Sequence, residues 1–286
     1  MNEIPREGSP RLSVGSPAVR PWLVVSTLSW REFIRFFRQP NRVVGAIGTP
    51  LLFWLLFGAG LHQSFQVATD GPSFREYFFP GTLVLILMFT AIFSSVSIIE
   101  DRREGFLQSV LVAPIPPWSI VLGKILGSTL IAWFQVALCL VLVLTLDIQL
   151  SGGNVLCMLG VLLLGALLMT SMGFAMAWNM ESIQGFHAVM NLVLMPMWLL
   201  SGAFFPVPAL ADDVVFSQQV LHWVMRCNPL TYVVAPLHEL LVGSVANGRT
   251  WFPSLGTSLA VTLLFLLAAF TLACKVSQRR TRGDLL

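Results

Sequence analysis

The residues best suited to recognition lie in segment 100–124, between two long hydrophobic runs. The segment carries six charges of both signs and three prolines. Its apolar residues follow the spacing i, i+1, i+4, i+5, at Phe106, Leu107, Val110 and Leu111. This spacing places them on one face of about two helical turns. A short helix with an apolar face that the segment cannot bury against itself either rests in lipid headgroups or docks a soluble partner. The residues alone leave both interpretations open.

Other candidate motifs in the chain lack the residues or the spacing that catalysis or metal binding would require. Residues 150–154 read Leu-Ser-Gly-Gly-Asn, like the signature of an ABC ATPase, but the chain has no Gly-x-x-x-x-Gly-Lys-Ser/Thr loop. We therefore interpret them as a turn between two spans. His238-Glu239 lacks the second histidine of a zinc-protease motif, no Gly-x-Ser-x-Gly occurs, and the cysteines and histidines have no metal spacing. We expect no catalytic residue, no metal site and no cofactor bound by this chain.

Polar groups inside the hydrophobic runs are few and uncharged. The candidates for lining a pathway are Ser94, Ser95 and Asn191, although Asn191 lies one turn from His187 and a hydrogen bond between packed helices is the simpler interpretation. Ion-coupled carriers usually need charged groups at mid-depth, so this composition argues against that class. A lining of such groups beside many Phe and Met would suit an amphipathic or lipid-linked substrate.

The composition indicates an integral membrane protein. Hydrophobic residues make up 56% of the chain and charged residues 11%, and the mean hydropathy is +0.78. Six runs meet or approach the length of about 20 residues that crosses a membrane. They are residues 43–61, 78–99, 119–146, 155–178, 188–205 and 251–273. Pro196 and the pair Ser201-Gly202 predict a kink or an early end in the fifth run.

The distribution of positive charge predicts the orientation. Residues 1–21 are expected to form a flexible tail, and residues 22–39 a basic amphipathic helix in the inner headgroup layer. Fourteen of the 17 Lys and Arg residues precede the first run, flank segment 100–124 or follow the last run. The positive-inside rule then places both termini and this segment in the cytoplasm, with residues 276–286 as a basic tail.

The third run begins with Gly123 and Gly127, a Gly-x-x-x-Gly spacing that lets helices approach closely. Packing within the chain is favoured over a dimer contact. Lys124, between these glycines, is expected to reach the inner headgroups.

The outer connection after the fifth run is too apolar for a solvated loop. Asp212 and Asp213 resemble the N-cap region of a helix that continues to about Cys227, and a further apolar stretch follows. The segment at about 202–243 is therefore expected to dip back into the membrane or to cap a pore mouth. The expected fold is an all-α membrane protein with six transmembrane helices, an amino-terminal amphipathic helix, a short cytoplasmic helix at about 101–117 and this membrane-dipping segment.

Two motifs resemble those of permease subunits of ABC transporters of the type-2 exporter class. The first is Glu-x-x-x-Glu-Gly-Phe-Leu at 100–107, followed by Pro114 and by Leu-Gly-Lys at 122–124. The second is Ser-Gly-x-Phe-x-Pro at 201–206, followed by Asn-Pro-Leu-Thr-Tyr at 228–232. The resemblance covers roughly residues 22–275. The chain departs from the pattern at Ala235 and His238, where an Asp and an Arg often stand, so no single member's substrate is carried over.

The resemblance implies that segment 101–117 is the coupling helix, which seats in a cleft of an ATP-binding subunit. It assigns roles in coupling to Glu100, Arg102, Glu104, Gly105, Phe106, Leu107, Leu111 and Pro114. The apolar outer segment, broken by Gly and Pro, predicts an outer gate or re-entrant segment at the motif residues Ser201, Gly202, Phe204, Pro206, Asn228, Pro229 and Tyr232. ATP and Mg would be bound by the partner subunit, and not by this chain.

The resemblance also implies an exporter in the bacterial cytoplasmic (inner) membrane. The permease would pair with a second copy or a paralogue and with two ATP-binding subunits, among membrane lipids and without nucleic acid. Drug-like amphiphiles and lipid-linked glycans both remain open as substrates. A secondary ion-coupled carrier and a non-transporting membrane scaffold or enzyme remain as alternatives.

Overall fold

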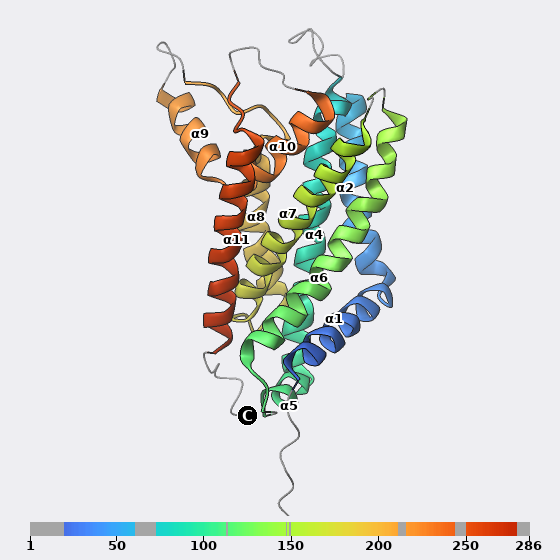
Figure 1. Ribbon diagram of the computed structural model, residues 1–286, viewed down its shortest axis with the longest axis vertical. Helices are drawn as coiled ribbons and strands as arrows, with labels where there is room; N and C mark the ends of the chain where they lie inside the picture. The colour runs from blue at the N-terminus through green and yellow to red at the C-terminus, as the bar shows by residue number, and fades with distance from the viewer. Residues whose placement is uncertain are drawn as a thin grey trace, which may run out of the picture.

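The computed structural model describes residues 20–60, 73–112, 114–146, 148, 150–210, 216–243 and 250–278 (Figure 1). Six helical segments in this part of the chain are long and apolar enough to cross a membrane. They are α2 (Pro40–Gly60), α4 (Phe74–Arg103), α6 (Pro117–Leu140) with the 3-10 helix η1 (Val141–Thr145), α7 (Gly152–Ala177), α8 (Ile183–Trp198) with the π-helix η2 (Leu199–Ala203), and α11 (Leu255–Ser277). The predicted all-α membrane fold with six spans is confirmed.

In the described part of the chain, four shorter helices lie at the two ends of the bundle. Helices α1 (Pro21–Phe37) and α5 (Phe106–Val112) lie at one end, and α9 (Phe216–Cys227) and α10 (Thr231–Val242) lie at the other (Figure 1). We call the end with α1 and α5 the basic end, because arginines of α1 and of the last turn of α4 meet there. Asp212, Asp213 and most of the two expected tails lie outside the described residues.

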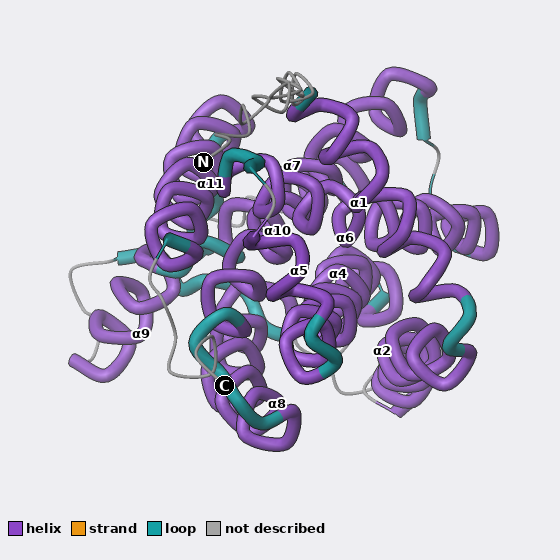
Figure 2. The backbone as a smooth tube through the Cα atoms, turned by 90° about the horizontal axis from the view of Figure 1, so that it is seen from below, coloured by secondary structure: helices purple, strands orange, loops and turns teal. Residues whose placement is uncertain are grey.

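Helix α4 is the centre of the fold. In its most apolar stretch 89% of the residues are buried, whereas the value is 22% for α2, α8 and α11. It packs against α2, α6, α7, α8 and α10, and the view along the bundle places it in the middle (Figure 2). A helix that is apolar on all sides is expected at such a position. Segment 100–124 therefore begins at the end of the most enclosed helix.

The close packing of α1 against α6 depends on two glycines. A Cβ added to Gly123 would lie 2.9 Å from the Cβ of Leu28, and one added to Gly127 would lie 2.8 Å from the Cβ of Glu32. The Ser29 hydroxyl donates a hydrogen bond of 2.9 Å to the Gly123 carbonyl. The prediction that Gly-x-x-x-Gly serves packing within the chain is confirmed.

Replacing Gly127 with Leu should separate α1 from α6, because the new side chain has no space beside Glu32. Overpacking of this kind typically costs about 1–3 kcal/mol of unfolding free energy. Unfolding titrations in mixed detergent micelles would measure the loss. Gly160→Leu is the matched control, since nothing lies within 4 Å of a Cβ at Gly160. An equal loss in both variants would contradict the role given to the contact.

Candidate functional site

A left-handed glycine separates the central helix from α5. Gly105 has a φ of +75°, a conformation that costs other L-residues strain. Before it, the amide of Glu104 donates to the carbonyl of Glu100 at 2.9 Å and closes the last turn of α4. Helix α5 then begins at Phe106. The short helix that the apolar spacing predicts is confirmed, although it is shorter than segment 101–117, whose first three residues belong to α4.

The apolar face of α5 is divided between the chain's own core and its surface. Leu107 is 2% exposed and belongs to the main hydrophobic core, so the rest of the chain covers part of this face, an outcome that neither of the two interpretations included. Phe106 is half-buried, and the Arg31 guanidinium lies 3.8 Å from the centre of its ring. Val112 is 87% exposed and Pro114 is also exposed, whereas the side chain of Leu111 lies outside the described part.

A buried ionic network connects α1, α4 and α6 next to α5. Asp101 in the last turn of α4 is fully buried and accepts hydrogen bonds from Arg31, at 2.8 Å, and from Arg35 and Lys124. The Lys124 ammonium also donates to Glu32 at 2.6 Å. The expectation that Lys124 reaches the headgroups was therefore wrong. Carboxylates from α1 and α4 hold it inside the bundle.

Around this network, the last turn of α4 is tied to further elements. Glu100 accepts from Arg35, at 3.0 Å, and from Arg42 at the start of α2. Arg102 donates to the carbonyls of Trp178 and Met180, and Arg103 donates to the carbonyl of Glu181 at 2.9 Å. The last turn of α4 thus holds α1, α2, α6 and the connection between α7 and α8 together.

The charges of the network stabilise one another. The hydrogen bond with Asp101 raises the pKa of the Arg31 guanidinium above its ordinary value. A buried carboxylate without such partners would be strongly disfavoured. Sequence reasoning missed Asp101 and Glu32 as members of a site. The available signal was Glu32, which stands on the apolar face of an amphipathic helix beside Ser29 and Phe36.

The candidate pathway residues do not form one group. Ser94 and Ser95 are buried in α4, and the hydroxyl of Ser95 occupies the space beside Gly173 of α7. Asn191 lies on the exposed side of α8. Among the described residues, no group of three or more His, Cys, Asp or Glu side chains could hold a metal ion.

At the opposite end, the fifth span breaks as its Pro and Gly residues predict. Ser201 and Gly202 lie in η2, and Gly202 has a φ of +87°. The Tyr77 hydroxyl of α4 donates a hydrogen bond of 2.9 Å to the Gly202 carbonyl. Phe204 then packs edge-on against an aromatic cluster of Phe57, Phe74 and Phe78, with ring centroids 5.4–6.0 Å apart. Pro206 follows and is half-buried.

The second outer motif joins α9 to α10. Asn228 donates to the Met197 carbonyl of α8 and accepts from the Leu230 amide at 3.0 Å. Pro229 is buried, and the Tyr232 hydroxyl donates to the Arg226 carbonyl at 2.8 Å. Helix α10 itself is largely buried against α4, α7 and α11. The two outer motifs thus meet where the broken fifth span contacts α10.

Comparison with known proteins agrees with this arrangement. The family model described as ABC-2 type transporter matches residues 24–242. The ycf38 protein of Cyanophora paradoxa, whose name describes a transport permease, is 27% identical over 259 residues, which cover 86% of each chain. The inner membrane transport permease YhhJ of Escherichia coli is 28% identical over 56% of this chain and 45% of its own. The probable multidrug ABC transporter permease YbhR of Escherichia coli is 25% identical over 66% of this chain and 50% of its own.

The matched region begins in α1 and ends at the last residue of α10, so it includes both ends of the bundle. It therefore contains the α4–α5 junction, the ionic network and both outer motifs. The chain belongs to the ABC-2 type transporter family, as a membrane-spanning transport permease.

Proposed function

We propose that this chain is the transmembrane subunit of an ATP-driven exporter, which moves an amphipathic or lipid-linked substrate outward across a bacterial cytoplasmic membrane. A separate ATP-binding subunit, present in two copies, binds ATP and Mg and supplies the energy. A second permease chain completes the path. The name of the relative YbhR, a probable multidrug ABC transporter permease, supports an amphipathic cargo.

One observation carries the proposal. Glu104, the C-cap of α4, and Val112 of α5 are exposed, while Leu107 and the last turn of α4 anchor α5 to the core and to four other elements. A helix that only rested in headgroups would need no such anchoring. A force applied to α5 by a partner would act on α1, α2, α6 and the α7–α8 connection at once.

The proposed orientation places the basic end in the cytoplasm. A cysteine introduced at position 103, in a variant without the four native cysteines, should resist a membrane-impermeant thiol reagent in intact cells. A cysteine at position 70, which lies outside the described residues, should react. The physical reason is the concentration of Lys and Arg at the basic end. Labelling at 103 and protection at 70 would reverse the orientation.

The contact with an ATP-binding subunit can be tested at the junction between α4 and α5. Glu104→Lys should lower co-purification of the partner in mild detergent, because it reverses a surface charge at the proposed cleft while the Glu104–Arg35 pair, at 3.4 Å, contributes little to stability. Phe106→Ala should act in the same direction by removing the ring beneath Arg31. Normal membrane abundance is expected for both variants. If both retain the partner and transport normally, α5 is only a membrane anchor.

A transport assay in reconstituted vesicles tests the alternative of an ion-coupled carrier. The buried charges of the described residues pair with one another near the basic end, as in a structural network, so they give no support to an ion path. Transport in reconstituted vesicles should stop with orthovanadate, which traps ABC ATPases. Transport that continues unchanged would favour the carrier.

A further inference from the structure

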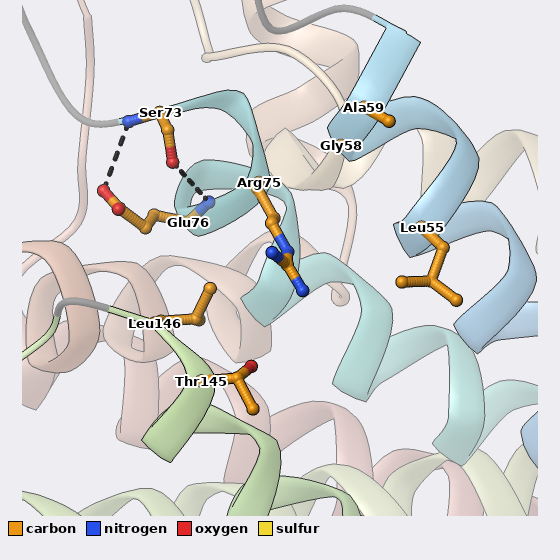
Figure 3. A pocket seen from close by; sticks show the side chains of 8 residues that line it. All are labelled: Leu55, Gly58, Ala59, Ser73, Arg75, Glu76, Thr145 and Leu146. Carbon is orange, nitrogen blue, oxygen red and sulfur yellow. Dashed lines mark hydrogen bonds between the residues drawn. The ribbon is translucent and has the colours of Figure 1, made fainter.

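A cavity of about 490 Å³ opens at the end of the bundle opposite the basic end. It lies between helices α2 and α4 and the end of η1, and both polar and apolar residues line it (Figure 3). Its described lining residues are Leu55, Gly58, Ala59, Ser73, Arg75, Glu76, Thr145 and Leu146. None of them belongs to the coupling segment or to the outer motifs.

Arg75 is held in place in this cavity, and no described carboxylate pairs with it. Its guanidinium lies 4.6 Å from the centre of the Trp54 ring, and the Trp54 indole donates a hydrogen bond of 3.0 Å to the Arg75 carbonyl. Gly58 leaves the space for the side chain, since a Cβ there would lie 3.1 Å from the Arg75 Cγ. Arg75 forms no ion pair with any described residue. A cation that the described residues position but do not neutralise is suited to an anionic ligand.

The carboxylate of the neighbouring residue Glu76 points away from the Arg75 guanidinium (Figure 3). Glu76 accepts a hydrogen bond of 3.2 Å from the Ser73 amide, as part of a capping box at the start of α4. It points toward Ser73, whereas Arg75 points into the space between Leu55 and Thr145 (Figure 3). The two opposite charges line one cavity and do not pair with each other. This separation suits a ligand that itself carries a negative and a positive group.

The surroundings indicate where such a ligand comes from. Leu56 on α2 and Val141 and Leu144 on the α6–η1 segment are 59%, 57% and 85% exposed. They lie on the same elements as the lining residues Leu55 and Thr145, and they give these membrane-spanning segments exposed apolar surface. A ligand with a charged head and apolar chains would lie along them, with its head at the membrane–water boundary.

We propose that this cavity binds a phospholipid of the surrounding membrane with a zwitterionic head, a phosphate joined to a primary ammonium, as in phosphatidylethanolamine. The phosphate contacts the Arg75 guanidinium, the ammonium approaches the Glu76 carboxylate, and the acyl chains lie along α2 and the α6–η1 segment. This lipid site does not depend on the proposed transport or on an ATP-binding partner.

The test measures lipids retained by the purified full-length chain. The protein in mild detergent is mixed with equal amounts of phosphatidylethanolamine and phosphatidylglycerol of matched acyl chains, and native mass spectrometry counts the adducts. The parent should retain more of the ethanolamine lipid. Arg75→Gln should lower its retention about tenfold, as expected for loss of one charge-assisted hydrogen bond.

Two further variants separate the site from general effects. Glu76→Gln keeps the capping pattern, in which Glu and Gln both serve, and should bring the ratio of the two lipids close to one. Arg226→Gln removes another arginine at the same end, which lies over Trp223 and Trp251, and should leave retention unchanged. Inorganic phosphate at millimolar concentration should displace neither lipid.

Four results would overturn the inference. They are full retention in Arg75→Gln, an equal loss in Arg226→Gln, no preference for the ethanolamine lipid in the parent, and displacement by inorganic phosphate. The last of these would indicate a site for small anions in place of a lipid site.

Discussion

Replacing Asp101 with Asn is expected to lower the unfolding free energy by about 3–5 kcal/mol, the cost of removing one partner from a buried ionic pair. Asp101 is fully buried and accepts hydrogen bonds from Arg31, Arg35 and Lys124. Asn keeps the shape but not the charge, so Lys124 would retain only Glu32 as a counterion. Unfolding titrations of the permease alone, in mixed detergent micelles, would measure the loss.

Two comparisons make this expectation specific to the network. Glu104→Gln removes a carboxylate that is 61% exposed and should change stability by at most about 1 kcal/mol. Lys124→Met combined with Asp101→Asn removes both members of a pair, and should cost at least about 0.5 kcal/mol less than the sum of the single changes. Strict additivity would mean that the two side chains do not interact.

Much of the fold could be predicted because the membrane imposes simple rules. Long apolar runs have only one way to satisfy their backbone groups, and a helix results. Local signals were equally informative where a single residue determines the backbone. Gly105 marks the end of α4, and Pro196 with Gly202 marks the break in the fifth span. Gly123 and Gly127 indicated a close helix contact but not which helix makes it.

The ionic network could not be predicted, because its members are far apart in the chain. Lys124 alone resembles a lysine that reaches lipid headgroups, and Asp101 alone resembles one charge in a polar connection. Only the packing of α1 against α6 brings Glu32 to Lys124. Leu107 was misjudged for the same reason. Its spacing predicted the correct helical face, but nothing local showed that the core of this chain already covers it.

The buried and exposed residues of α5 should respond differently to substitution. Leu107→Ala should destabilise the permease itself by about 2–5 kcal/mol, because it removes a core side chain that is 2% exposed. Val112→Asp should leave the unfolding free energy nearly unchanged, because Val112 is 87% exposed. It should instead weaken binding of the proposed ATP-binding subunit about 30-fold, the effect of losing a contact anchor worth about 2 kcal/mol. Unfolding titrations of the permease alone and partner titrations in mild detergent would separate the two effects. If Val112→Asp binds the partner normally, the exposed end of α5 is not the docking surface. If Leu107→Ala lowers only partner binding, Leu107 leaves the core to contact the partner, and the division of the helix drawn from its burial is wrong.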